Sequence, residues 1–340
     1  MPFRQTLARY GIDPYLIAIA ATVAAAAILP VRGSGAVVMN ELVIAAIALL
    51  FFLYGARLST ESVISGLTHW RLQLTVFLST FALFPVLGLI ATGILKPWLP
   101  ADLTLGLMFM CVLPSTVQSS IAFTSIARGN VPAALCSASV SNLIGMVITP
   151  VLTALLLSSS GVNFDFGAVE KILLQLLVPF VAGQLLRPFI GGFIKRHRAV
   201  IGYVDRGSIL LVVYAAFSEG VVAGIWAKVG VESLALVLGL DSLLLVIVIL
   251  TTTYGSRRLG FSKEDEITIV FCGSKKSLAS GVPMANILFP GQGLGMIVLP
   301  IMLFHQIQLF VCATMAQRYA RRPAAAAPVG EPLPQPAAGE

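Results

Sequence analysis

Two adjacent lysines, Lys275 and Lys276, lie inside an apolar stretch near the end of the chain. The stretch covers residues 270–283 and is interrupted by Gly273, Gly281 and a final proline. A lysine at the centre of a bilayer costs about 2.5 to 3.5 kcal/mol on insertion scales, so two together require a cavity, a counter-charge or a ligand. The pattern therefore predicts a broken membrane helix that carries a binding site.

A second polar cluster follows Pro114 in another apolar stretch. Proline removes a backbone donor and clashes with the preceding turn, so it kinks or interrupts a helix. A kink needs only the next two hydroxyls, whereas an unwound crossing would use the whole cluster to contact an ion or a substrate. The crossing is favoured because the cluster exceeds what a kink requires. The predicted substrate- or ion-binding residues of the two stretches are Ser115, Thr116, Gln118, Ser119, Ser120, Ser274, Lys275, Lys276 and Ser277.

Polar side chains also occur in neighbouring apolar stretches. Ser137 and Ser141 are four residues apart and share a helix face, and Asn142 is adjacent. These three join the binding set, although hydrogen bonds between helices would explain any one of them equally well. His305 and Gln306 are candidates for the polar lining of the site. A packed, hydrogen-bonded histidine is the simpler alternative for the first of these two.

Two acidic residues, Glu219 and Asp241, also lie within apolar stretches. Carboxylates inside a membrane pair with a base, relay protons or bind cations. The simplest prediction is that one of them neutralises Lys275 or Lys276. For Glu219 an alternative stays open, namely a position near a helix end where the carboxylate reaches interfacial water.

The composition predicts a membrane protein. Of the 340 residues, 57% are hydrophobic and only 11% are charged, and the mean hydropathy is +0.93, whereas typical soluble domains are about 25% charged. The net charge of +7 does not indicate nucleic-acid binding, because the basic residues are spread over short connections. The four cysteines form no CxxC motif or Cys/His cluster, so neither a disulfide framework nor a metal site is expected.

Ten apolar stretches have about the length that crosses a hydrocarbon core. They cover residues 13–30, 40–56, 72–95, 103–127, 131–157, 169–190, 205–225, 231–254, 266–289 and 295–317. With the N-terminus inside, sixteen lysines and arginines fall in inside connections and four in outside connections. This bias predicts a multi-pass protein of the plasma (inner) membrane with both termini cytoplasmic.

The two halves of the chain share an offset of about 157 residues between the starts of corresponding stretches. Two repeats of five helices insert with opposite topology. The predicted fold is therefore an all-α polytopic membrane protein with ten transmembrane helices in two inverted five-helix repeats, in which helices 4 and 9 are discontinuous and cross. Its parts are a cytoplasmic N-terminus (1–12), a first repeat (13–157), a second repeat (158–318) and a disordered cytoplasmic tail (319–340).

These features resemble the bile acid:sodium symporter superfamily, and within it the SBF-like branch of sodium/bile acid cotransporter 7-like proteins. The similarity covers about residues 10–318, and its most specific motif is the Phe-Cys-Gly-Ser-Lys-Lys-Ser-Leu-Ala sequence at 271–279. The resemblance implies oxygen ligands for two sodium ions on helices 4 and 9, beside a substrate cavity. Phe271 then stands in place of a glutamate ligand, and Lys275 and Lys276 in place of a Gln-Asn pair.

Lysines in place of sodium ligands change the expected ion chemistry. An ammonium donates three hydrogen bonds and accepts none, and like charges about 4 Å apart repel by roughly 4 kcal/mol at an effective dielectric of 20. Sodium sites are therefore doubtful here, and we hypothesise that a lysine ammonium replaces the sodium charge. It would either hold the crossing together or attract an anionic substrate. Because burial favours neutral lysine, coupling to protons stays open.

The predicted function is secondary active transport of a small organic anion, of the bile-acid-like, steroid or carboxylate class, by alternating access and coupled to a cation, with the classical sodium sites altered. The alternatives are a non-transporting membrane regulator on the same fold and a proton-coupled or uncoupled carrier. No enzyme is expected, since no phosphate loop, metal-ligand spacing or matched nucleophile and base is found. The expected partners are the anion and the lipid bilayer, without nucleic acid or cofactor; monomer and homodimer both stay open.

Overall fold

The computed structural model describes residues 14–57, 69–157, 166–222, 224, 230–289 and 293–322. Every regular element in these ranges is a helix, which confirms the all-α class. The predicted N-terminal segment 1–12 and residues 323–340 of the predicted tail lie outside the described residues. Residues 319 and 320, assigned to the tail from the sequence, belong to the last turn of the final helix.

The chain contains a run of short helices, a run of long continuous ones, and two further short helices before the last long one. In chain order they are α2 (Pro14–Ile28), α3 (Ser34–Arg57), α5 (Trp70–Leu78), the π-helix η1 (Ser79–Leu83), α6 (Phe84–Leu95), α7 (Ala101–Val112), α8 (Gln118–Ile126), α9 (Val131–Leu157), α10 (Phe166–Arg196), α11 (Arg198–Val222), α12 (Val231–Arg258), α13 (Lys263–Gly273), α14 (Leu278–Leu288) and α15 (Leu294–Ala320). Within the described ranges, seven helical segments are long and apolar enough to cross a bilayer. Ten spans in inverted repeats stay a prediction, because α2 has only 15 residues and two other predicted spans are broken.

Both interruptions predicted from the sequence are present. Helix α7 ends at Val112 and α8 begins at Gln118, and between them Leu113 has an extended backbone with φ −71° and ψ 154°. Helix α13 ends at Gly273 and α14 begins at Leu278, preceded by an extended Ser277. Each break leaves backbone donors and acceptors without a helical partner in an apolar interior. The function of the two breaks therefore depends on which groups form hydrogen bonds with these backbone donors and acceptors.

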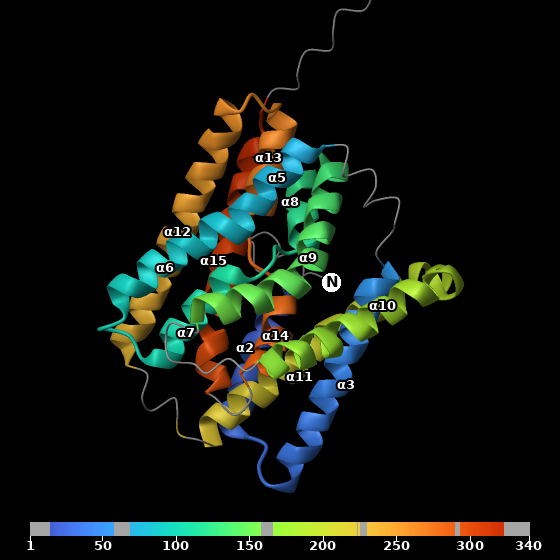
Figure 1. The fold of residues 1–340 in the computed structure, drawn as a ribbon, viewed down its shortest axis with the longest axis vertical. Helices are drawn as coiled ribbons and strands as arrows, with labels where there is room; N and C mark the ends of the chain where they lie inside the picture. Colours follow the sequence, from blue (N-terminus) through green and yellow to red (C-terminus); the bar gives the residue numbers. More distant parts are fainter. Residues whose placement is uncertain are drawn as a thin grey trace, which may run out of the picture.

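The helices form two groups that lie side by side (Figure 1). The four-helix group consists of α2, α3, α10 and α11, and the broken-helix group contains α5 to α9 and α12 to α15. Within the first group, a Cβ atom built on Gly55 would lie 1.9 Å from the Phe180 carbonyl oxygen, and one on Gly183 would lie 2.0 Å from the Phe52 carbonyl oxygen. Helices α3 and α10 are therefore in backbone contact, as small residues allow in membranes. Between the groups, α11 packs against α14 and α15.

An ion-pair cluster fixes the beginning of α13. The buried carboxylate of Glu266 accepts hydrogen bonds from the Arg257 guanidinium at 3.0 and 3.1 Å, from Lys263 at 2.6 Å and from the Tyr319 hydroxyl at 3.1 Å. These partners come from α12, α13 and α15. The cluster therefore holds three helices of the broken-helix group together at one end of α13.

The π-helix η1 was not predicted, and it aims one carbonyl at the interior. At the end of η1, the N–H of Phe84, the first residue of α6, donates to the Ser79 carbonyl, five residues back. The same spacing would give Thr80 the N–H of residue 85 as donor, but Pro85 has none. The Thr80 carbonyl therefore needs a donor from elsewhere in the fold.

Candidate functional site

The two helix breaks pass one another in direct contact. The Ser277 N–H donates to the Pro114 carbonyl at 2.9 Å, and the Ser115 hydroxyl donates to the Cys272 carbonyl at 2.6 Å. Figure 1 shows α8 and α13 on one side of this crossing and α7 and α14 on the other. Four half-helix ends consequently meet at one place, the C-terminal ends of α7 and α13 and the N-terminal ends of α8 and α14.

The carbonyls of residues 111 to 115, at the first break, each have a hydrogen-bond donor. They accept, in order, from Lys276 Nζ at 2.8 Å, Thr149 Oγ1 at 2.8 Å, Lys276 Nζ at 2.8 Å, Ser277 N at 2.9 Å and Asn142 Nδ2 at 2.6 Å. At the second break, the carbonyls of residues 271, 272 and 273 accept from Ser120, Ser115 and Ser79 hydroxyls. Much of the polar cluster predicted from the sequence therefore serves to hydrogen-bond backbone groups that the helix breaks leave without partners.

Lys276 acts as an internal cation of this crossing. Its side chain is 0% exposed, and its ammonium donates to the Thr80, Cys111 and Leu113 carbonyls, each at 2.8 Å. Two of these carbonyls belong to the C-terminal end of α7, which carries partial negative charge. The ammonium also lies 4.2 Å from the centre of the Phe84 ring. All three N–H donors of the lysine are therefore satisfied without a carboxylate.

Gln308 fixes the backbone of this lysine. Its Oε1 accepts from the Lys276 N–H at 2.9 Å, and its Nε2 donates to the Lys276 carbonyl at 2.9 Å. The same Nε2 lies 2.9 Å from His305 Nδ1. Gln308 was absent from the predicted set, although it lies three residues after His305 in the sequence. The structure therefore assigns His305 to support of the crossing through Gln308.

Lys275 has a different environment from its neighbour. It is also 0% exposed, yet its ammonium has no hydrogen-bond partner among the described residues. It lies 4.1 Å from the centre of the Phe123 ring and 5.4 Å from that of Phe271. Cation–π contacts contribute about 2 kcal/mol when desolvated, which does not replace three hydrogen bonds for a buried charge. Lys275 thus carries a buried amino group without a hydrogen-bond acceptor among the described residues.

Ser141 and Asn142 on α9 belong to the crossing. The Ser141 hydroxyl accepts from the Ser115 N–H at 3.1 Å. The Asn142 side chain donates to the Ser115 carbonyl at 2.6 Å and accepts from the Ser280 hydroxyl at 2.7 Å, so that it joins the two breaks. Ser137 lies one turn before Ser141 on α9, and its hydroxyl donates instead to Gln73 Oε1 on α5 at 2.8 Å.

Asn142→Leu is expected to lower the free energy of unfolding by about 1 to 3 kcal/mol, because it leaves the Ser115 carbonyl buried without a donor. Thermal unfolding of the purified protein in detergent would measure the change. Gln118→Leu is the matched control, since Gln118 is exposed at the start of α8. Equal unfolding midpoints for the two variants would contradict the bridging role of Asn142.

The other predicted hydroxyl residues at the two breaks form hydrogen bonds within or near their own helices. The Thr116 hydroxyl lies 2.7 Å from that of Ser119 and 3.1 Å from that of Ser120. The Ser274 hydroxyl donates to the Val270 carbonyl of its own helix at 2.6 Å. These hydrogen bonds stabilise the start of α8 and the end of α13.

The predicted pairing of an acid with a lysine is not found. Glu219 is exposed on α11, and Asp241 on α12 is 0% exposed with neither carboxylate oxygen hydrogen-bonded among the described residues. Among the described residues, neither acid forms an ion pair with Lys275 or Lys276. The physical reason is that backbone carbonyls already balance the Lys276 charge, so no carboxylate is needed there.

Gln306 lies on the face of α15 that points away from the crossing. It lines an apolar cavity of about 490 Å³ between α2, α11 and α15, together with Ile17, Ile19, Ala20, Val23, Phe217, Leu299, Met302 and Leu303. The predicted polar lining therefore divides, with His305 toward Lys276 and Gln306 toward this cavity. Neither lysine contacts the cavity, so Lys275 is closed off from it in this conformation.

Comparison with known families decides the class of the protein. The sequence pattern of the SBF-like CPA transporter family matches residues 13–321. The chain belongs to this family. The resemblance to SBF-like proteins is thereby confirmed. Membership of this family makes the protein a membrane transporter, which implies a lipid bilayer and a small-molecule substrate.

Relatives of this SBF-like transporter agree with that class. An uncharacterised protein of Pseudomonas aeruginosa is 56% identical over 92% of this chain and 95% of its own length. A protein of Escherichia coli named "Putative symporter YfeH" is 52% identical over 92% of this chain and 94% of its own length. Sodium/bile acid cotransporter 7 of Rattus norvegicus is 30% identical over 90% of this chain and 92% of its own length. The functional names among these are those of transporters and not of enzymes.

Proposed function

We propose that this SBF-like transporter moves a small organic anion and that Lys275 supplies the charge that the anion meets. The observation that carries the proposal is the contrast between the two lysines, one fully hydrogen-bonded and one without an acceptor. A buried ammonium without partners is costly, and a carboxylate or sulfonate would supply the missing acceptors. The anion is thus the group that completes the site.

The helix ends at the crossing favour the same charge. Helix α8 begins at Gln118 and α14 begins at Leu278, three residues after Lys275. The N-terminal end of a helix carries partial positive charge, and half-helix N-termini face anionic groups in transporters with broken helices. The negative ends of α7 and α13 are covered by Lys276 and by hydroxyls. The balance left at the crossing therefore suits an anion.

Access to Lys275 requires movement of the two helix groups. The lysine is fully buried, and the 490 Å³ cavity lies between α2 and α11 of the four-helix group and α15 of the broken-helix group. We propose that rocking of one group against the other extends this cavity to the crossing from alternate sides. Ten spans in two inverted repeats, with both termini cytoplasmic in the plasma membrane, are part of this proposal.

The group bound by the Thr80, Cys111 and Leu113 carbonyls bears on which coupling ion the protein uses. The rat relative is named a sodium cotransporter. In this chain the Thr80, Cys111 and Leu113 carbonyls, a set of oxygens that suits a monovalent cation, already bind the Lys276 ammonium. We propose that no sodium ion binds at this set. Separate sodium and proton gradients across proteoliposomes would identify the coupling ion by the gradient that drives uptake.

A screen of anions tests the proposed function. Purified protein is heated with carboxylates, steroid sulfates and bile-acid-type anions, each paired with a neutral analogue. A true ligand at 100 times its Kd stabilises the protein by about 2.7 kcal/mol, and the same anion is then expected to exchange across proteoliposomes. Neutral analogues that stabilise the protein as well as anions would contradict the proposal. Binding without exchange would indicate a membrane receptor instead of a transporter.

A further inference from the structure

Asp241, on α12, is a buried acid that the anion site does not use. Its side chain is 0% exposed, and neither carboxyl oxygen has a hydrogen-bond partner among the described residues. Val237, Leu244 and Leu245, which lie about one turn before or after it on the helix, are buried and apolar. An ionised carboxylate isolated in such surroundings is much less stable than in water, so the group is expected to be neutral. The surroundings of Asp241 therefore favour a protonated carboxyl.

Asp241 lies near the end of α7 that Lys276 binds. Cys111 interacts electrostatically with both Asp241 and Lys276, and its carbonyl accepts a hydrogen bond from Lys276 Nζ at 2.8 Å. A Cβ atom built on Gly88 of α6 would lie 2.8 Å from Cys111 Sγ, and α6 packs against both α7 and α12 (Figure 1). Asp241 and the crossing are thus connected through Cys111.

The other titratable groups around α12 belong to two helices, since residues 79–95 of η1 and α6 contain none. Those of α13 are Lys263, Glu264, Asp265, Glu266 and Cys272. Those of α15 are His305, Cys312, Arg318 and Tyr319. Helix α13 ends at Gly273, whose built Cβ lies 3.4 Å from Thr252 Cγ2, about three turns after Asp241. Glu266 pairs with Arg257 still farther along α12, and His305 lies 2.9 Å from Gln308 Nε2. None of these groups forms a hydrogen bond with Asp241 among the described residues.

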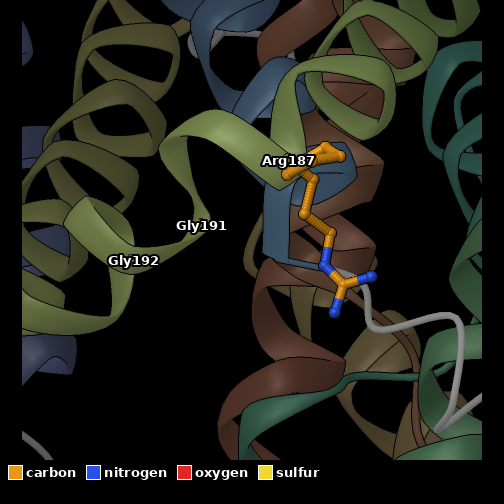
Figure 2. A pocket seen from close by; sticks show the side chains of 4 residues that line it. Arg187, Gly191 and Gly192 are labelled. Carbon is orange, nitrogen blue, oxygen red and sulfur yellow. The ribbon is translucent and has the colours of Figure 1, made fainter.

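The two hollows of the described residues do not reach Asp241. Figure 2 shows the one on α10, where the Arg187 side chain extends from the helix near Gly191 and Gly192. The apolar cavity of about 490 Å³ is lined by residues of α2, α11 and α15. Asp241 lines neither hollow and is fully buried. Water therefore reaches its carboxyl group only after a change of conformation.

We propose that Asp241 is a proton-binding site and that this closed conformation, in which Asp241 and both lysines are buried, forms only while Asp241 holds a proton. In an open conformation the carboxyl group gives its proton to water and becomes a carboxylate. The carboxylate then opposes closure, because burial would isolate its charge. Each passage through the closed conformation thus carries one proton. Together with the proposed function, on which this step rests, the requirement makes the proton the coupling ion.

Infrared difference spectroscopy tests for the proton without any anion. Protonated carboxyl groups and carboxylates absorb at different frequencies, and the wild-type spectrum minus that of Asp241→Asn is expected to show one protonated carboxyl at neutral pH. Asp241→Leu gives the same comparison if the asparagine variant does not fold. Glu232→Gln is the matched control, since Glu232 is exposed in the first turn of the same helix, and it should leave the band unchanged. A carboxylate band in place of the carboxyl band would overturn the proposal.

Labelling of Cys111 with N-ethylmaleimide tests whether the proton controls closure. Cys111 is 0% exposed in the closed conformation, so labelling reports opening beside Asp241. Wild type and Asp241→Asn are compared at the same pH, so that the pH dependence of the thiol reaction itself cancels. We expect the ratio of the wild-type rate to the variant rate to rise with pH, by up to about tenfold per pH unit for one proton. A constant ratio would show that closure does not depend on the proton.

The proton site and the anion site fail separately in these experiments. Loss of the proposed anion site at Lys275 would leave the infrared band and the labelling ratio unchanged, because neither measurement uses an anion. In the proteoliposome assay with separate gradients, we expect a proton gradient to drive uptake by the wild type. Uptake driven by sodium alone would overturn proton coupling through Asp241 and leave the anion site intact.

Discussion

Lys276→Met is expected to lower the free energy of unfolding by about 3 kcal/mol or more, because three buried carbonyls lose their donor and each unsatisfied buried group costs about 1 to 3 kcal/mol. Methionine fills a similar volume but donates no hydrogen bond, so the Thr80, Cys111 and Leu113 carbonyls would lose their donor in an apolar interior. The variant should unfold at a clearly lower temperature than the wild type in the same detergent. An unchanged midpoint would show that the three carbonyls find other donors.

Chemical rescue isolates the ammonium from the rest of the side chain. Lys276→Ala leaves space beside the three carbonyls, and methylammonium brings N–H donors to that space. We expect methylammonium to raise the unfolding midpoint of Lys276→Ala but not that of the wild type. Tetramethylammonium, which has no N–H group, should raise neither. An equal rise with sodium would show that the carbonyl set accepts a metal ion once the lysine is absent.

Unlike Lys276→Met, Lys275→Met is expected to leave the stability of the fold nearly unchanged or to raise it. The substitution removes a buried charge without a hydrogen-bond acceptor, and apolar replacement of buried charges is often neutral or stabilising. The lost contacts with the Phe123 and Phe271 rings are worth about 0.5 to 2 kcal/mol. The unfolding midpoint should therefore stay near that of the wild type or rise.

Anion binding should fail in the same Lys275→Met variant. Truncation of one partner of a buried, hydrogen-bonded charge pair costs about 2 to 5 kcal/mol of binding free energy, a loss of about 30-fold or more in affinity. Stabilisation by the anion that exchanges in wild-type proteoliposomes measures this loss. A variant that unfolds as early as Lys276→Met and still binds the anion would make Lys275 a structural residue. The proposed substrate site would then lie elsewhere.

Adjacent lysines with opposite expected effects follow from the geometry of the crossing. A broken helix presents successive residues in different directions, so Lys276 turns toward the end of α7 and η1 while Lys275 turns toward the rings of α8 and α13. The Lys276 ammonium is thereby bonded to backbone carbonyls, and the Lys275 amino group is the one that we propose meets the anion. The hypothesis that a lysine holds the crossing applies to Lys276, and the hypothesis that a lysine attracts an anion applies to Lys275.

The sequence by itself determined the membrane class and the two helix breaks. Apolar length is a local property, and so is the missing N–H of Pro114, so both can be recognised without knowing what packs against them. The family resemblance came from local motifs for the same reason. The presence of Ser141 and Asn142 near the break at Pro114 also followed, since the next helix in sequence is usually a neighbour in space.

Only the tertiary structure decided which side chains satisfy the crossing. The carbonyl of Thr80 is free because η1 and Pro85 remove its helical donor, and it meets Lys276 from a position 196 residues away in the chain. Periodicity does not reveal such a contact, nor does it reveal that Asp241 forms no hydrogen bond among the described residues. Charge pairing was expected because carboxylates are the usual partners of buried lysines. The fold instead used backbone carbonyls, which every residue carries and no sequence pattern distinguishes.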